Sequence, residues 1–271
     1  MAVDRPSWAP EGVDVDMPSP ARMYDALLGG SHNFAVDRRA VEMAVAKVPD
    51  LPKVAWSNRA FLRRSVRFMV AAGIRQFLDI GSGIPTSGNV HEVAWEADPQ
   101  CRVQYVDLDS VAVAHSRAIL AGQERAAAIE GDLRAPKELL ADPRLRKMID
   151  LSQPVGVLLV AVLHLLSDGE NPRGVVAAIR DAIAPGSYIA ISHLTSAQRP
   201  EDAMRLGEQA KAGSGVGIYF RSREDITALF DGLTVVAPGV VELALWRPES
   251  AEDIYEEPGR SLGLAGVGRR D

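Results

Sequence analysis

The chain of 271 residues holds only one cysteine, Cys101. A disulfide within the chain needs two cysteines and a cysteine-based zinc site needs more, so both are excluded, and we expect Cys101 to lie at a strand edge. Long apolar runs are also missing: the longest, residues 155–166, is too short to span a bilayer and contains His164. Residues 1–20 carry acids and prolines where a signal peptide would be apolar. We therefore predict a cytoplasmic protein with no membrane partner.

An excess of positive charge is missing as well. The net charge is −6 and the isoelectric point is near 5.5. Such a balance gives no support for a nucleic acid or an anionic membrane as the partner, although a local patch on an acidic protein can still bind RNA. The composition is 47% apolar and 24% charged, which is ordinary for a globular protein with a sizeable core.

The first part of the chain is predicted to be helical. Residues 1–19 read as an extended or disordered lead-in, and residues 20–73 read as an N-terminal helical cap. Helical patterns run from about residue 19 to 28, from 37 to 47 and from 55 to 72. We expect the arginines of the third pattern to lie mostly on a solvated face; they are Arg59, Arg63, Arg64 and Arg67.

Strands and helices then alternate over residues 74–248, which predicts a doubly wound α/β domain with a parallel sheet. The predicted parallel strands are residues 74–80, 103–107, 127–130, 155–163 and 188–193. A closing antiparallel hairpin is predicted from residues 233–237 and 240–246. Residues 249–271 are rich in glycine and charge and have no periodicity, so they read as a C-terminal tail.

The first predicted strand runs into a glycine turn, Asp79-Ile80-Gly81-Ser82-Gly83-Ile84-Pro85-Thr86. Glycines let a ligand approach the backbone, and the helix that follows offers unpaired N–H groups. Ligands of open α/β sheets bind at the carboxyl ends of the strands. The polar residues at these predicted ends are Asp79, Asp107, Asp109, Asp132, His164, Ser192 and His193.

These acids favour a nucleoside with a cationic end. Asp107 follows the turn by roughly 25 residues, where nucleoside-binding folds place an acid that accepts from the ribose hydroxyls. Asp132 can accept from an adenine amino group. The third glycine of a dinucleotide motif is replaced by Thr86, and Asp79 would repel a pyrophosphate, which favours S-adenosylmethionine over NAD. No Gly-Lys-Ser/Thr follows, so a phosphate loop is excluded.

Each residue also has a purely structural interpretation. The glycines can simply form a tight turn, Asp107 can be an ordinary strand-end residue, Asp109 can cap the next helix, and Asp132 can belong to a turn. Only the ordered set on successive strands favours a ligand site.

At this point the sequence resembles a known class. Through Asp79-Ile80-Gly81-Ser82-Gly83 and Val106-Asp107-Leu108-Asp109 it is similar to the class I S-adenosylmethionine-dependent methyltransferases. More narrowly, it resembles a bacterial S-adenosyl methyltransferase family, formerly a domain of unknown function, from about Pro20 to Trp246. The motifs that carry this resemblance are residues 21–30, 33–37, 58–64, 81–86, 162–164 with Asp168, 184–188 and 191–193. Residues 265–270 also look like the family's ending, so the tail is expected to pack on the domain.

The resemblance implies a Rossmann-like, doubly wound seven-stranded sheet of order 3-2-1-4-5-7-6, with strand 7 antiparallel, under an N-terminal helical lid. It implies S-adenosyl-L-methionine as cofactor and S-adenosyl-L-homocysteine as product, but no acceptor. The cofactor-binding residues that we predict are Asp79, Gly81, Ser82, Gly83, Thr86, Asp107, Leu108, Asp132, Leu133, Arg22, Tyr24, Asn33 and Arg59. Arg59 is suited to pair with the methionine carboxylate, although Arg59 and Arg22 can also be ordinary surface charges.

His164 and His193 are the candidate catalytic bases, since a histidine can take up a proton near neutral pH. Their structural alternative is a buried, hydrogen-bonded histidine. We expect no metal: His32, His91 and His115 lack a convincing ligand spacing, and only Asp132 with Asp168 leaves an opening for one.

Three functions follow from the sequence. We expect a methyltransferase that acts on a small-molecule acceptor. The alternatives are a macromolecule methyltransferase and a non-catalytic module that binds S-adenosylmethionine or S-adenosylhomocysteine and acts through a protein partner. The acidic charge and the lack of an Asn-Pro-Pro-Tyr-type motif disfavour methylation of nucleic-acid amino groups. A homodimer is compatible with the sequence.

Overall fold

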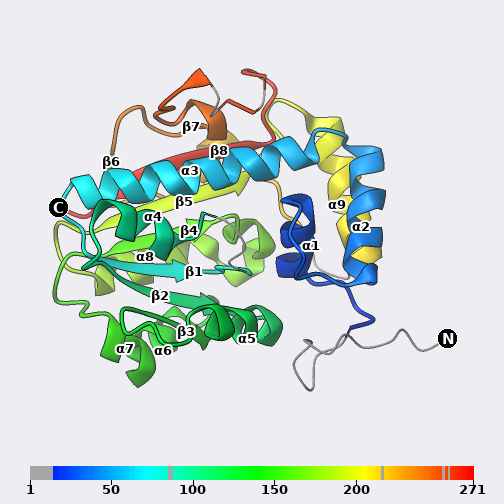
Figure 1. Cartoon of the computed structure of the whole chain (residues 1–271). Coiled ribbons are helices and arrows are strands. Elements are labelled where there is room, and N and C mark those ends of the chain that lie inside the picture. The colour runs from blue at the N-terminus through cyan, green and yellow to red at the C-terminus, as the bar shows by residue number, and fades with distance from the viewer. Residues whose placement is uncertain (1–14, 85–87, 215–216, 252–253, 256) are drawn as a thin grey trace.

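The computed structural model describes residues 15–84, 88–214, 217–251, 254–255 and 257–271. Its centre is a sheet with helices on both faces, and a group of N-terminal helices stands beyond the carboxyl end of β1 (Figure 1). The strands are β1 (Gln76–Ile80), β2 (Arg102–Asp107), β3 (Ala126–Glu130), β4 (Gly156–Val160), β5 (Tyr188–Leu194), β6 (Thr234–Val235), β7 (Val241–Glu242) and β8 (Gly263–Arg269).

The helices follow the predicted alternation with the strands. They are α1 (Pro20–Leu27), α2 (Ala35–Lys47), α3 (Leu51–Ala71), α4 (Val90–Ala97), α5 (Ser110–Ile119), α6 (Pro136–Ala141), α7 (Pro143–Met148), α8 (Pro172–Ala182), α9 (Pro200–Ser214) and α10 (Arg223–Ala228). Short 3₁₀ turns are η1 (Leu163–Leu165), η2 (Asp168–Glu170) and η3 (Leu243–Leu245). Proline occupies the first or second position of α1, α3, α6, α7 and α8, where a missing N–H costs nothing.

The sheet order is β3-β2-β1-β4-β5-β8-β6, and β7 also pairs with β8. The first five strands in this order are parallel, whereas β8 runs antiparallel to β5 along the whole of β5. The expected arrangement, with one antiparallel strand inserted between the fifth and sixth strands, is confirmed. The doubly wound order reverses direction at β1 and β4, which is where such folds bind ligands.

The predicted closing hairpin of residues 233–237 and 240–246 is wrong. Only two residues of each segment are strand, as β6 and β7, and both pair with β8 instead of with each other. The inserted antiparallel strand therefore comes from residues 263–269, in the segment that the sequence suggested as a tail. Because this strand is rich in glycine, its sequence lacks the alternation of apolar and polar residues that predicts a strand. Glycine is nevertheless needed here, since a Cβ on Gly268 would approach Leu233 to 2.9 Å and Phe230 to 3.0 Å.

Two apolar cores lie on opposite faces of the sheet. One joins α3, α4 and α5 to strand residues such as Phe77 and Tyr105. The other joins α6, α7 and α8 to the alternate strand residues, such as Leu78 and Val106. Since side chains of a strand alternate between faces, continuous apolar strands are required to fill both cores.

The expectation that the arginines of α3 lie mostly on a solvated face is wrong for two of them. Arg64 is 3% exposed, and its Nε and Nη2 donate to the carbonyls of Trp246 and Leu243, each at 2.7 Å. Arg59 is 7% exposed. Helix α3 crosses the sheet and is covered by neighbouring elements, so its polar stripe is not a solvent face (Figure 1). In the part of the chain that the structure describes, no helix is both long and apolar enough to cross a membrane.

We expect Gly268→Val to destabilise the fold by about 1–3 kcal/mol, because the added side chain enters a filled space. Urea unfolding measures the change. Arg269→Val in the same strand replaces an exposed side chain and should change the free energy of unfolding by no more than about 0.5 kcal/mol. Equal losses for both variants would contradict the packing of β8 described above.

Candidate active site

A cavity of about 610 Å³ lies at the carboxyl ends of β1–β5. The ends of the strands form one wall, and α1, α2, α3 and α9 contribute the others. In Figure 1, α1, α2 and α9 stand at the side of the molecule toward which β1 points, and α3 runs from that side across the sheet. The volume falls within the range of roughly 300–1,000 Å³ that is usual for small-molecule sites.

The glycine turn shapes the wall of this cavity after β1. Gly81 has φ of +74°, and a Cβ there would approach Val162 to 2.3 Å, so this position needs glycine on both counts. Gly83 has φ of +63° and no atom near its virtual Cβ. The turn thus brings bare backbone to the cavity surface, where a ligand can lie against it.

Asp107 at the end of β2 holds the turn in place. Its carboxylate accepts from the backbone N–H of Gly83 at 2.7 Å and from that of Asp109 at 2.8 Å. Burial raises the pKa of Asp107, while these N–H donors favour the ionised form. The carboxylate retains further lone pairs for ribose hydroxyls.

Asp109 serves two structural roles. It caps α5 by accepting from the N–H of Val111 at 2.8 Å, as its structural interpretation predicted. It also accepts a hydrogen bond from the hydroxyl of Ser19. The residues just before α1 are therefore attached to the end of β2, which closes the cavity over the strand ends.

Asp79 and Arg59 are two buried, oppositely charged groups that line the cavity. No hydrogen bond or ion pair of either side chain is found among the described residues, and Nε of Arg59 is buried without a partner. The guanidinium instead lies over the ring of Tyr24, at 5.6 Å from its centroid. Burial raises the pKa of Asp79 to about 7; the charge of Arg59 opposes this shift and Asp107 adds to it.

Asp132 lines the cavity beyond β3 but already has a partner. Both carboxylate oxygens accept from Arg134, with a shortest distance of 2.7 Å, and this interaction lowers the pKa of Asp132. Leu133 beside it is buried and Leu108 is 56% exposed; both also line the cavity. An exposed apolar side chain next to Asp107 is suited to cover the face of a flat ring.

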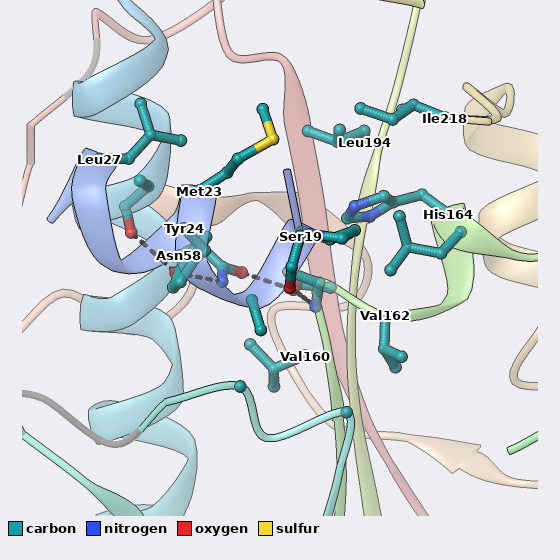
Figure 2. Close-up of a pocket in the computed structure, with 18 of the residues that line it drawn as sticks. Ser19, Met23, Tyr24, Leu27, Asn58, Val160, Val162, His164, Leu194 and Ile218 are labelled. Atoms are coloured by element: carbon teal, nitrogen blue, oxygen red, sulfur yellow. Dashed lines mark hydrogen bonds between the residues drawn. The ribbon is translucent and has the colours of Figure 1, made fainter. Parts of the chain in front are cut away.

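A chain of hydrogen bonds connects the sheet with the N-terminal helices (Figure 2). The N–H of Ala161 donates to Ser192 Oγ at 2.9 Å, and Ser192 donates to Asn58 Oδ1 at 2.5 Å. Asn58 Nδ2 donates to the hydroxyl of Tyr24 at 2.8 Å, and this hydroxyl donates to the carbonyl of Ala55 at 3.1 Å. Ala161 has φ of +58°, which is strained for alanine, and the turn ends β4 three residues before its predicted end.

His164 consequently lies on η1, after the strand, and not at the strand end itself. Its ring points into the cavity, near Val162 and Leu194 (Figure 2). Burial, followed by the neighbouring His193 and Arg221, lowers the pKa of His164 to about 3, so the imidazole is neutral at neutral pH. Its Nδ1 is buried and has no hydrogen-bond partner among the described residues.

His193 is held by its neighbours on both ring nitrogens. Its Nε2 lies 2.7 Å from Nη1 of Arg221, and its Nδ1 lies 2.7 Å from the carbonyl of Leu194. Because guanidinium can only donate, Nε2 must accept and Nδ1 must carry the proton. Burial lowers the pKa of His193 to about 4. The ring is therefore a fixed, neutral support beside His164, with no nitrogen left to take a proton from a ligand.

The structure brings most of the predicted residues to one cavity. Those that line it are Tyr24, Arg59, Asp79, Gly81, Ser82, Gly83, Asp107, Leu108, Asp132, Leu133, His164 and His193. Arg22 and Asn33 are not among its lining residues. Arg22 pairs with Asp37 at 2.8 Å, and Asn33 donates to Asp25 at 2.8 Å, so both stabilise the segment around α1. Thr86 lies outside the described residues.

Sequence reasoning missed the residues that support this site. Arg221 donates to Asp168 and to the carbonyl of Leu166, each at 2.8 Å, as well as contacting His193, and thereby holds the segment that carries His164. Nothing local in the sequence indicates this role, because its partners lie 28–58 residues away. Asn58 could have been found, since it directly precedes Arg59 in a recognised motif. Among the described residues, no group of three or more acids, histidines or cysteines could hold a metal ion.

A glycine turn after β1, an acid at the end of β2 and a cavity at the point where strand order reverses define a nucleoside-binding α/β fold. Comparisons with known proteins identify the family within this fold. The model of the S-adenosyl methyltransferase family matches residues 6–271. A Thermobifida fusca protein assigned as a methyltransferase is 43% identical, with a TM-score of 0.91 over 98% of this chain and 99% of that one.

A DUF574 family protein from Streptomyces avermitilis is 32% identical, with a TM-score of 0.90 over 95% of this chain and all of that one. An O-methyltransferase family protein from Burkholderia thailandensis shares the fold only, at 18% identity and a TM-score of 0.50 over 82% of this chain and 60% of that one. A search of curated proteins found no match.

The chain belongs to the S-adenosyl methyltransferase family. It is an S-adenosylmethionine-dependent methyltransferase, as the sequence resemblance predicted.

We expect Asp79→Asn to stabilise the ligand-free protein, and the gain to grow from about pH 4 to about pH 7. The carboxyl pKa is 3.8 when exposed and about 7 in the fold, so between these values the folded state holds a proton that the unfolded state has released. The stability of the parent protein therefore falls as pH rises through this window and levels off above it, whereas asparagine has no such proton.

Urea unfolding at several pH values measures this difference. Asp231→Asn, which removes one exposed carboxylate, serves as the control and should show no comparable trend over the same window. A difference between Asp79→Asn and the parent that stays constant with pH would show that Asp79 is not protonated in the folded state.

Proposed function

We propose that S-adenosylmethionine binds in the cavity at the carboxyl ends of β1–β5, and that its methyl group passes to a small-molecule acceptor. The observation that carries this proposal is the presence of Asp79 and Arg59, a buried acidic and a buried basic group that line one cavity without pairing with each other. Burying a charge without a partner is costly, so such groups call for a ligand with complementary charges. An amino acid ammonium and carboxylate meet both.

The roles of the other residues follow from their positions. Asp107 would accept from the ribose hydroxyls, and the backbone of Gly81–Gly83 would lie against the ligand. Leu108 would cover one face of the adenine, and Leu133 would lie beside it. Asp132 is a weaker candidate for the adenine amino group because Arg134 already occupies both of its oxygens.

When bound, S-adenosylmethionine supplies an activated methyl on a cationic sulfur: a lone pair of the acceptor forms the new bond to carbon, and the S–C electron pair stays on sulfur. The protein's part is to exclude water and to orient the acceptor. His164, uncharged and lining the cavity, has an unpaired Nδ1 among the described residues and can receive a hydrogen bond from the acceptor. With a pKa lowered to about 3 it is a weak proton acceptor, so its contribution is to orient the acceptor. We assign His193 a positioning role, since both its nitrogens are occupied.

We expect Arg59→Met to weaken the affinity for S-adenosylhomocysteine by about 10- to 100-fold. A hydrogen bond to a charged group contributes about 1.5–3 kcal/mol, and 1.4 kcal/mol is a factor of ten in Kd. Isothermal titration calorimetry measures the affinity. Arg67→Met, two turns further along α3, removes an exposed guanidinium that pairs with Glu96 and Glu249, and should leave the affinity unchanged. Equal affinities of the two variants would remove Arg59 from the site.

A small-molecule acceptor is separated from the alternatives by a labelling experiment. The protein is incubated with methyl-labelled S-adenosylmethionine and cell extract, and the extract is divided into small-molecule, protein and nucleic-acid fractions. Label in the small-molecule fraction is the expected result, and label confined to protein or nucleic acid would contradict it. Tight binding of S-adenosylhomocysteine with no transfer to any fraction would favour the non-catalytic module.

A further inference from the structure

The charged and uncharged residues around the cavity are separated. The charged lining residues that the structure describes are all found in one part of the cavity wall. They lie at or just beyond the carboxyl ends of β1, β2 and β3, on α3, and on η2. The lining residues that α1, α2 and α9 contribute are uncharged, and most of them are apolar. Together with Leu194 of β5 and Ile218 beyond α9, they form a second region of the cavity, which we refer to as the apolar compartment. It is defined by Met23, Leu27, Val41, Leu194, Leu206 and Ile218.

One polar ring projects toward the apolar compartment. His164 is 8% exposed, and within the described part of the chain its Nδ1 has no hydrogen-bond partner. Figure 2 shows its ring directed into the space that Met23, Leu194 and Ile218 border. Two hydrogen bonds hold the backbone that carries this ring. The N–H of Tyr219 donates to the carbonyl of His164 at 2.8 Å, and Arg221 donates to the carbonyl of Leu163 at 3.1 Å.

We propose that the apolar compartment binds an uncharged, largely apolar acceptor that carries a hydroxyl group, and that this hydroxyl pairs with His164. The inference rests on the proposed function, because it places the acceptor next to the cofactor in one continuous cavity. It adds the chemical class of the acceptor, which neither the family nor the fold indicates.

Electrostatics excludes charged acceptors from this region. A carboxylate or an ammonium placed among apolar side chains would lose its hydration without gaining an opposite charge, which costs several kcal/mol. The charged groups of the opposite end are engaged with one another or suited to the cofactor. A hydroxyl both donates and accepts, so it can satisfy an imidazole nitrogen in either tautomer.

Binding to protein saturated with S-adenosylhomocysteine tests the proposal without requiring turnover. The probes are 2-naphthol, 4-phenylphenol and 1-decanol, each compared with the carboxylate of the same skeleton: 2-naphthoate, 4-phenylbenzoate and decanoate. We expect at least one alcohol to bind at least about tenfold more tightly than its carboxylate, measured by calorimetry or by ligand-observed NMR. Failure of all three alcohols, or equal affinity for the carboxylates, would overturn the proposal.

Matched variants locate the binding site. Val41 lines the compartment, whereas Met43, on the same helix α2, is 43% exposed on the outer surface. Val41→Asp should abolish binding of the alcohol, and Met43→Asp should leave it unchanged. The affinity for S-adenosylhomocysteine, measured first, shows that each variant is folded. If Val41→Asp and Met43→Asp bound the alcohol equally well, the acceptor would lie elsewhere.

The role of His164 is tested with naphthalene, which has the same ring system as 2-naphthol but no hydroxyl. In the parent protein 2-naphthol should bind about five- to tenfold more tightly than naphthalene, the effect of one neutral hydrogen bond. His164→Leu should remove this preference while it keeps the affinity for naphthalene. A preference that survives in His164→Leu would show that the hydroxyl has another partner.

These results also separate the inference from the proposed function. If the protein fails to bind S-adenosylhomocysteine, the proposed function itself fails. If S-adenosylhomocysteine binds but no alcohol does, only the assignment of the apolar compartment is lost.

Discussion

The cavity depends on the hydrogen bonds that join the strand ends to the N-terminal helices. Ala161 leaves β4 in a strained conformation, which costs of the order of 1–3 kcal/mol. The bonds from Ala161 through Ser192 and Asn58 to Tyr24 contribute about 0.5–1.5 kcal/mol each and offset that strain. The same bonds set the spacing between the sheet and α1. A single network therefore determines both the turn that precedes His164 and the position of the helices that cover the site.

A second constraint is the burial of charge. Asp79 and Arg59 remain apart although each would be stabilised by the other, because their backbones belong to β1 and α3, whose packing in the core is independent of the pair. In the proposed function, both groups would therefore be free to pair with the ammonium and the carboxylate of the ligand. Preorganised charges of this kind give affinity without a large rearrangement on binding.

The two ends of the cavity differ in the charge of their lining residues. Charged groups gather at the strand ends, where free backbone N–H groups and helix N-termini can solvate them. The lining residues that α1, α2 and α9 contribute are uncharged and mostly apolar. Under the proposal made above, this separation would give a cationic cofactor and an uncharged acceptor the different surroundings that they need in one space.

By itself the sequence determined the parallel strands, the glycine turn and most residues of the cavity wall, because these depend on local patterns: apolar runs, positive-φ glycines and acids at strand ends. It did not reveal β8, whose glycines erase the alternation of a strand and are explained only by the side chains of Leu233 and Phe230 packed against them. Nor did it separate the buried Arg59 and Arg64 from the exposed Arg67, since helical spacing cannot show which face a neighbouring segment covers. The support of His164 by Arg221, the neutral state of its ring and the apolar compartment were decided by the tertiary structure alone, because each arises from contacts between segments far apart in the chain.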